Sequence, residues 1–383
     1  MRATSWLRDE LDIRRGGATR LASMEGLRGL AVGLVFLVHY TVLVGPWLSG
    51  TGAMHNLLFR IADAGNVGVD LFFVLSGFLI YGHLMEHEQD YRTFIARRAR
   101  RIYPTFLVVF AVYLVLSGAL PGESKLPTRP IEIPVFLLAN ALLIPGIVPI
   151  PAFITVAWSL SYEFFFYLTV PILITRARLR ERTSEWRIRL FVRIGLGFLL
   201  LGGLISGTHP RMSMFFGGMV LWEWLKYRWP DRSQAPGAAA RLDRSAVVAL
   251  AVGVLAPLAL QSNVVLGLPR IAVVLVAFTV LCAGCFAVDG RCRRWFTWTP
   301  LRLLGNVSFS FYLIHSLVLQ GFFLGLEAVR APTQDATWLW FALLPVLFLA
   351  SAAAATAMFL LVEKPLSLNR RGLRPTGRRR QPG

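Results

Sequence analysis

Two titratable side chains lie in the first apolar stretch, where ionisable groups are costly inside a membrane and mark candidate functional sites. Arg28 and His39 are eleven residues apart. In an α-helix this spacing places both on nearly the same face, with an axial separation of ~16 Å. We expect Arg28 at the cytoplasmic mouth of a helix and His39 in its outer half, where an imidazole can serve as a general base. The alternative is a snorkelling arginine and a histidine that only hydrogen-bonds to a neighbouring helix.

Two carboxylates are predicted at a depth similar to that of His39. Asp70 lies near the start of GNVGVDLFFVLSGFLI, and Glu163 lies near the start of WSLSYEFFFY. Either carboxylate could orient the imidazole of His39 and hold its reactive tautomer. For Glu163 the alternative is an acid at the membrane interface, within a belt of aromatic residues.

A later apolar stretch carries a stripe of polar residues. Ser308, Tyr312 and His315 follow the i, i+4, i+7 spacing of one helix face. Such a stripe either lines a site or packs two helices together through small and hydroxylated side chains.

The basic run FIARRARRIYP is a candidate anion site. Its residues Arg97, Arg98 and Arg101 form a compact cationic patch that suits a multiply phosphorylated ligand, and Tyr103 at its end is a further candidate. The patch could instead only fix the orientation of the chain in the membrane. The nearby H-x-x-E-H pattern over 83–87 matches some zinc proteases, but no third ligand is evident, so we expect no metal site.

Membrane-spanning helices must position these side chains. The sequence has 383 residues, 55% of them hydrophobic and 16% charged, with a mean hydropathy of +0.58. This balance is too apolar for a soluble domain. About ten stretches are long enough to cross a hydrocarbon core of ~30 Å. They cover residues 25–45, 66–84, 102–120, 157–175, 190–206, 212–226, 246–262, 269–288, 304–326 and 338–362.

Arginine blocks predict the orientation of these stretches. Basic blocks follow every second stretch, so the positive-inside rule is obeyed throughout if the N- and C-termini both lie in the cytoplasm. Residues 133–148 are apolar but short, and a full span there would send the block over 176–193 outside, so we expect a re-entrant or interfacial segment. The dispersal of the arginines between apolar runs argues against a nucleic-acid partner, despite the net charge of +19.

We therefore predict an all-α, polytopic transmembrane helical bundle in the inner (plasma) membrane. Residues 1–23 are expected to be a cytoplasmic N-terminal segment, 24–365 the membrane domain and 366–383 a basic disordered tail near anionic lipid. The charged residues before the first apolar run argue against a signal peptide.

At these residues the sequence resembles the acyltransferase-3 family of membrane acyltransferases, from about residue 22 to residue 365. Arg28 and His39 match the family's Arg-x10-His motif, and Asp70 with the following FFVLSGFLI matches its second helix. The other matches are Arg98 and Arg101 in an Arg-x-x-Arg motif with Arg97 beside them, Trp158, Ser159 and Glu163 in W-S-L-x-x-E, Phe216 and Gly217 in a loose F-x-G element, GNVSFSFYLIH ending at His315, and Glu363 with Pro365 in E-x-P.

The resemblance implies a membrane O-acyltransferase that moves an acyl group, commonly acetyl, from cytoplasmic acyl-coenzyme A to a hydroxyl of a glycan, a surface polysaccharide or a macrolide-like metabolite. The phosphates would be held by Arg98 and Arg101 with Arg28, and by Arg97 beside them. His39 would be the general base, oriented by Asp70 or Glu163, and a covalent acyl-histidine relay stays open. The rival class is a transporter or flippase that uses the buried charges as a proton relay.

Overall fold

The computed structural model describes residues 10–11, 19–48, 50, 52–204, 209–260, 267–332 and 336–368. Within these ranges every named element is helical, which confirms the predicted all-α class. The elements that build the bundle are α2 (Thr19–Val44), α3 (Ala53–Gly65), α4 (Val67–Glu86), α5 (Tyr91–Ala119), α6 (Ile133–Ala141), α7 (Trp158–Arg176), α8 (Ser184–Leu204), α9 (Ser213–Tyr227), α10 (Trp229–Arg232), α11 (Ala238–Ala259), α12 (Gly267–Ala287), α13 (Arg291–Phe296), α14 (Thr299–Asn306), α15 (Ser308–Val329), α16 (Trp338–Met358) and the π-helical η6 (Phe359–Leu368).

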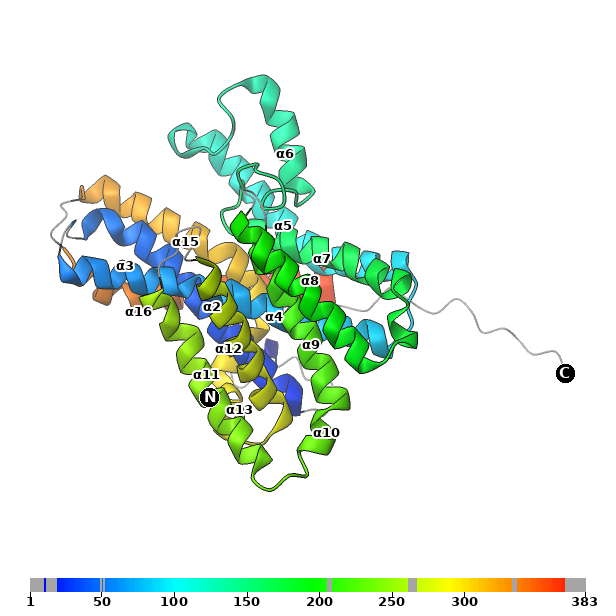
Figure 1. Ribbon diagram of the computed structural model, residues 1–383. Helices are drawn as coiled ribbons and strands as arrows, with labels where there is room; N and C mark the ends of the chain where they lie inside the picture. The colour runs from blue at the N-terminus through cyan, green and yellow to red at the C-terminus, as the bar shows by residue number, and fades with distance from the viewer. Residues whose placement is uncertain are drawn as a thin grey trace.

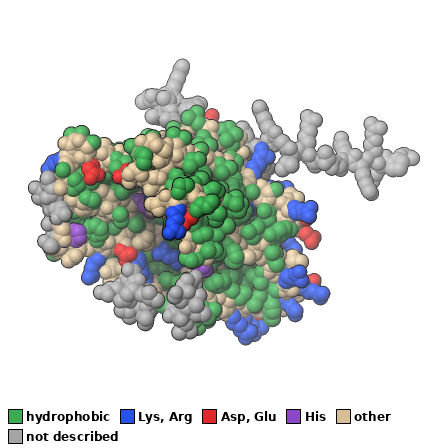
Figure 2. All heavy atoms as spheres, turned by 90° about the horizontal axis from the view of Figure 1, so that it is seen from above, with side chains coloured by type: hydrophobic (Ala, Val, Ile, Leu, Met, Phe, Trp, Pro, Cys, Tyr) green, Lys and Arg blue, Asp and Glu red, His purple; other side chains and the backbone are tan. Residues whose placement is uncertain are grey.

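The described helices include seven that are long and apolar enough to cross a membrane, as expected of a multi-pass membrane protein. They are Ala22–Trp47, Ala53–Glu86, Tyr91–Ala119, Ala238–Ala259, Gly267–Ala287, Ser308–Val329 and Trp338–Leu368. Each of the ten predicted stretches coincides with a helix, but α7, α8 and α9 fall outside this set. Helix α9 has only 15 residues, and the first half of α8 carries four charged side chains. Helix α7 has Glu163 together with several hydroxyl-bearing residues, which lower its hydropathy. Figure 2 shows a face covered largely by hydrophobic side chains, with most Lys and Arg near its edges.

The segment over 133–148 does not form a spanning helix. Helix α6 has nine residues, which gives a length of ~13 Å, less than half of a hydrocarbon core. Figure 1 shows α6 and its flanking loops projecting beyond the rest of the bundle. Asn140 closes the return of this loop, because its side chain accepts a hydrogen bond from the Phe153 backbone N–H at 2.7 Å and donates to Pro151 O at 3.2 Å.

Two features depart from the predicted layout, and two predicted segments lie largely outside the described residues. Helix α3 was not predicted; it leads into α4 through Asn66. Residues 366–368 of the predicted tail belong to η6, and the remaining residues of that tail lie outside the described part of the chain. Most of the predicted N-terminal segment over 1–23 also lies outside it.

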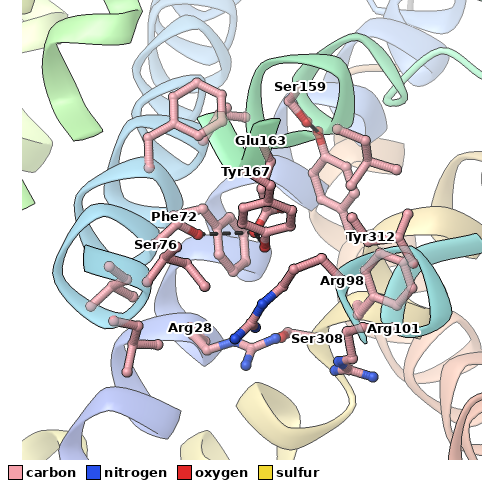
Figure 3. A pocket seen from close by; sticks show the side chains of 18 of the residues that line it. Arg28, Phe72, Ser76, Arg98, Arg101, Ser159, Glu163, Tyr167, Ser308 and Tyr312 are labelled. Carbon is pink, nitrogen blue, oxygen red and sulfur yellow. Dashed lines mark hydrogen bonds between the residues drawn. The ribbon is translucent and has the colours of Figure 1, made fainter. Parts of the chain in front are cut away.

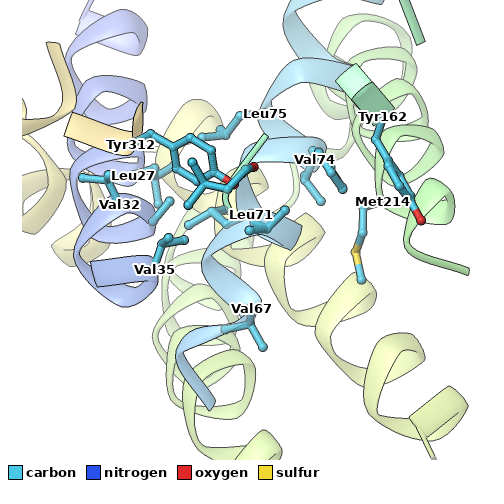
Figure 4. Packing of buried hydrophobic residues seen from close by; sticks show 14 of the residues in the cluster. Leu27, Val32, Val35, Val67, Leu71, Val74, Leu75, Tyr162, Met214 and Tyr312 are labelled. Carbon is cyan, nitrogen blue, oxygen red and sulfur yellow. The ribbon is translucent and has the colours of Figure 1, made fainter. Parts of the chain in front are cut away.

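Helices α2 and α4 form the centre of the apolar core. Figure 4 shows Leu27 and Val35 of α2 near Leu71 of α4, and all three are almost fully buried. Helix α4 contacts α9 through glycines: a Cβ on Gly77 would lie 2.1 Å from Phe215 O, and one on Gly218 would lie 2.1 Å from Val74 O. Small residues thus bring these two backbones close together, as in other membrane helix pairs.

A buried ion pair joins α8 to α9 and α4. The Arg187 guanidinium donates to Glu223 at 2.6 and 2.8 Å, and the Tyr81 hydroxyl donates to Glu223 Oε1 at 2.5 Å. Arg187 also donates to the backbone oxygen of Leu179. Because Glu223 is fully buried, these contacts are needed to compensate for its desolvation.

Candidate active site

A cavity of about 1210 Å³, counted with the space at its mouth, opens between α2, α4, α5, α7 and α15. Its wall combines apolar residues of α4 with a polar set drawn from all five helices. The polar residues are Arg28, Ser76, His83, Arg98, Arg101, Ser159, Glu163, Tyr167, Ser308 and Tyr312. We call this space the donor cavity, after the N–H donors of the three guanidinium groups on its wall. Figure 3 shows the guanidinium groups of Arg28, Arg98 and Arg101 gathered on the side away from Ser159.

The arginines of the donor cavity differ in their partners. Within the described residues, Arg28 and Arg98 form no ion pair. The Arg98 guanidinium instead lies over the rings of Phe94 and Tyr167, at 5.2 and 5.7 Å from their centroids. This end of the cavity therefore presents cationic groups whose hydrogen-bond donors are not engaged by a carboxylate.

Arg101 is held by a carboxylate from the end of the chain. Its Nη1 donates to Glu363 Oε1 at 2.5 Å, and Glu363 Oε2 accepts from Ser310 Oγ at 2.5 Å. Glu363 is fully buried, and it lies in the π-helical η6, a geometry that is frequent at functional sites. Glu363, from the E-x-P element, is thus the ion-pair partner of Arg101, from the Arg-x-x-Arg element.

The start of α5 fixes the arginine patch. Asp90 caps the helix, because its carboxylate accepts from the Thr93 backbone N–H at 3.0 Å. The same hydrogen bond holds the pKa of Asp90 below its usual range. From this start, the i, i+3 spacing brings Arg98 and Arg101 to one helix face on the cavity, whereas Arg97 is exposed and does not line it.

The far side of the donor cavity carries a carboxylate and two hydroxyls. Glu163 accepts from Ser76 Oγ at 3.0 Å, drawn as the dashed line in Figure 3, and from the Tyr167 hydroxyl. Ser159 Oγ and the Tyr312 hydroxyl lie 2.6 Å apart. Two members of the predicted stripe, Ser308 and Tyr312, therefore do line a cavity.

His39 pairs with His315, the third member of that stripe. His315 Nδ1 lies 3.0 Å from Phe311 O, and its Nε2 lies 3.4 Å from His39 Nδ1. His39 Nδ1 also lies 3.0 Å from Val35 O. A carbonyl can only accept, so each Nδ1 carries its proton when neutral, and Nε2 of His39 is left with an unshared electron pair. Neither histidine lines the donor cavity, but His315 lies one turn of α15 beyond Tyr312.

The expected pairing of a carboxylate with His39 is corrected by these contacts. Glu163 is engaged by Ser76 and Tyr167, and buried Asp70 faces Arg211, whose Nε lies 3.6 Å from Asp70 Oδ1. The Arg211 guanidinium in turn lies over the Trp158 ring, 5.6 Å from its centroid. Asp70 and Trp158 thus form a separate cluster outside the histidine pair.

Tyr103 packs away from the donor cavity. Its ring contacts Phe106 and Phe164 with centroid separations of 6.1 and 5.7 Å, and it is not among the cavity residues. The structure adds Ser76, His83 and Tyr167, which the sequence analysis did not select. Tyr167 lies four residues after Glu163, so helix periodicity could have found it. Among the described residues, no group of three or more His, Cys, Asp or Glu could hold a metal ion.

Comparison with known proteins identifies the family of the chain. A sequence model described as an acyltransferase domain matches residues 21–359. The chain belongs to the acyltransferase-3 family. The motif residues of the family account for Arg28, Arg98, Arg101, Ser159 and Glu163 on the cavity wall.

The chain is similar to several named proteins. It is 35% identical to the acyltransferase MdmB of Streptomyces mycarofaciens over 40% of this chain and 39% of that protein. It is 27% identical to the exopolysaccharide production protein ExoZ of Rhizobium meliloti (strain 1021), over 67% of this chain and 77% of that protein. It is 29% identical to the O-acetyltransferase OatA of Staphylococcus aureus, over 51% of this chain and 32% of that protein. The matches thus cover less than half of MdmB and OatA, and no solved structure matches the chain.

Proposed function

We propose that the protein is an integral membrane O-acyltransferase that takes an acyl group, acetyl in the simplest case, from acyl-coenzyme A in the cytoplasm. The observation that carries this proposal is the cationic end of the donor cavity, where Arg28 and Arg98 lack an ion-pair partner among the described residues. Guanidinium groups bind phosphate oxygens through paired, charge-assisted hydrogen bonds. Because no carboxylate must first be displaced, these two arginines are ready to bind the phosphates of the donor.

The length of the site suits a long donor. Arg28 and His39 are separated by ~16 Å along α2, from the helical rise per residue. A nucleotide bound at the arginines would direct its narrow pantetheine arm along the cavity toward Ser159 and Tyr312, with the thioester nearest the histidine pair. His83 lines the cytoplasmic part of the same wall and would face the nucleotide.

The histidine pair supplies the chemistry in this proposal. Nε2 of His39 takes the proton of the acceptor hydroxyl, and the oxygen attacks the thioester carbonyl carbon. The carbon–sulfur bond then breaks, and the coenzyme A thiolate recovers the proton from the imidazolium. The Val35 carbonyl accepts from His39 Nδ1–H and so holds the tautomer, the role first expected of a carboxylate, and His315 Nε2 lies 3.4 Å from the same nitrogen. A relay in which Nε2 first carries the acyl group uses the same atoms.

The names of the relatives support a class of acceptor, and the arginine blocks support an orientation in the membrane. The names of the relatives, an O-acetyltransferase and an exopolysaccharide production protein, support a hydroxyl of a glycan or surface polysaccharide, with a macrolide-like metabolite as the other class. We place the protein in the plasma membrane with ten spans and both termini in the cytoplasm, as the arginine blocks favour. The chemistry needs neither a metal nor a nucleic acid.

Donor binding tests the proposal directly. Purified protein in lipid nanodiscs should be stabilised by acetyl-coenzyme A, by ~2.7 kcal/mol at a hundred times the dissociation constant. Acetyl-pantetheine, which carries the same thioester without the nucleotide, should stabilise it far less at equal concentration, because the arginines have no phosphate to bind. Equal stabilisation by both compounds, or by neither, would reject the assigned donor site. A transporter would then be the better explanation of the buried charges.

A further inference from the structure

A second cavity lies at the other end of two helices that line the donor cavity. It has about 550 Å³, counted with the space at its mouth. Helix α5 contributes Arg101 to the donor cavity and Tyr113 to the second one, ~18 Å further along the axis. Helix α15 likewise contributes Tyr312 to the first and Leu317 to the second. His315 lies between these two α15 residues in sequence, so the histidine pair lies at an intermediate height along α15.

One buried polar group of the second cavity lacks a partner. Tyr113 is only 6% exposed, and its hydroxyl makes no hydrogen bond within the described residues. A buried hydroxyl without a partner is costly, so its position on a cavity wall points to a ligand that would complete it.

Four further polar side chains share this wall: Ser117, Glu123, Lys125 and Gln320. Lys125 Nζ donates to Thr155 Oγ1 at 2.5 Å. Together with the Tyr113 hydroxyl, these side chains form a polar edge on the wall of the second cavity.

The rest of the wall is apolar and reaches the outer surface of the bundle. It is formed by Phe153 and by four leucines: Leu116, Leu120, Leu317 and Leu324. Leu116 and Leu120 are 37% and 47% exposed on a helix that is apolar enough to span the membrane. The cavity thus has a polar edge and an apolar side continuous with the exposed apolar surface of the bundle.

We propose that this second cavity binds the acyl acceptor, and that the acceptor is an amphipathic molecule with hydroxyls along one edge and an apolar face. The proposal rests on the acyltransferase function proposed above. A fully hydrophilic saccharide would bury some of its hydroxyls against the leucines, where they find no hydrogen-bond partner. An amphipathic molecule instead matches both the polar and the apolar side of the cavity. The Tyr113 hydroxyl and Gln320 would bind its hydroxyl edge and direct one hydroxyl toward His39.

Two glycines on α15 provide a matched test of the cavity. A Cβ on Gly321 or on Gly325 would meet nothing within 4 Å, so a larger side chain fits at either position. Only Gly321 lines the second cavity. The variant Gly321→Leu should fill the cavity, and Gly325→Leu serves as the control on the same helix.

The assay uses octyl β-D-glucoside as the amphipathic probe and methyl β-D-glucoside as its hydrophilic counterpart, with labelled acetyl-coenzyme A and protein in nanodiscs. We expect a higher kcat/KM for octyl glucoside, a loss of about tenfold or more in Gly321→Leu through KM, and little change in Gly325→Leu. Transfer that favours methyl glucoside, an octyl glucoside that receives no label, or wild-type kinetics in Gly321→Leu would each overturn the inference.

A second pair of variants tests the hydroxyl contact. Tyr113→Phe removes one oxygen and should raise KM for octyl glucoside, whereas Tyr91→Phe, at the opposite end of α5 and outside both cavities, should not. An unchanged KM in Tyr113→Phe would remove this contact from the proposal. Acetyl-coenzyme A binding is measured on wild type and on every variant. If wild type binds no donor, the proposed function fails. If donor binding is intact but Gly321→Leu and Tyr113→Phe leave the acceptor kinetics unaltered, the acceptor cavity alone is rejected.

Discussion

Replacing Arg98 with glutamine removes a positive charge from the donor cavity without breaking an ion pair. The described residues around Arg98 contain no carboxylate partner, so the substitution leaves no orphaned buried charge. The lost contacts are those to the rings of Phe94 and Tyr167, worth ~0.5–1 kcal/mol at sites of this kind. A charge-assisted hydrogen bond to a phosphate is worth ~1.5–3 kcal/mol, which corresponds to a rise in Kd of roughly 10- to 150-fold.

Arg101 should behave differently, although it belongs to the same motif. Among the described residues, its removal leaves fully buried Glu363 with only the Ser310 hydroxyl as a hydrogen-bond partner. Breaking a buried ion pair costs ~3–5 kcal/mol, so Arg101→Gln should lower thermal stability and donor affinity together. Arg98→Gln should lower donor affinity with little loss of stability.

Both quantities are measured on the same nanodisc samples, with Kd from titration of acetyl-coenzyme A and stability from thermal unfolding. Arg97→Gln is the matched control, because Arg97 adjoins Arg98 in sequence but is exposed and does not line the cavity. If Arg97→Gln and Arg98→Gln weakened binding equally, a diffuse basic surface would explain it. If Arg98→Gln bound the donor like wild type, the assignment of the donor site would be refuted.

Three further predictions address the catalyst, the fold and the topology. His39→Gln should reduce acyl transfer by ~10²–10⁴-fold at an unchanged Kd for acetyl-coenzyme A, and full ester formation would remove His39 as the base. Arg187→Met leaves buried Glu223 without its cation and should cost ~3–5 kcal/mol of stability, seen as a lower unfolding temperature, with normal activity per folded molecule; unchanged stability would contradict the buried pair. Single cysteines over 176–182 should react with a membrane-impermeant label only from the cytoplasmic side, and labelling from outside would change the span count.

Helix periodicity identified some of the cavity residues that share one helix, but His39 and His315, predicted on the faces of Arg28 and of Tyr312, do not line the donor cavity. The i, i+3 spacing of Arg98 and Arg101 and the i, i+4 spacing of Ser308 and Tyr312 each predicted a common face, and both pairs lie on the donor cavity. The positions of the apolar stretches likewise follow from hydropathy, because the hydrocarbon core sets their length.

Contacts between helices could not be obtained in this way. Because Asp70 and Glu163 were predicted at a depth in the membrane similar to that of His39, we expected one of them to contact it. Depth, however, does not determine how each helix is rotated about its own axis. That rotation is set by packing, including the close approach of α4 and α9 at Gly77, and it directs Asp70 toward Arg211. The partner of His39 came instead from α15, as His315.

Transfer in sealed inside-out membrane vesicles tests the central claim most directly. In these vesicles the cytoplasmic face is outside, so added acetyl-coenzyme A reaches only the proposed donor side. We predict that wild-type vesicles incorporate labelled acetyl into a base-labile ester on a hydroxyl-bearing product, and that vesicles with Arg98→Gln or His39→Gln lose most of this label at equal protein content. Ester formation at the wild-type level in both variants, or none in wild-type vesicles whose protein binds acetyl-coenzyme A, would contradict an acyl transfer that runs from these arginines to this histidine.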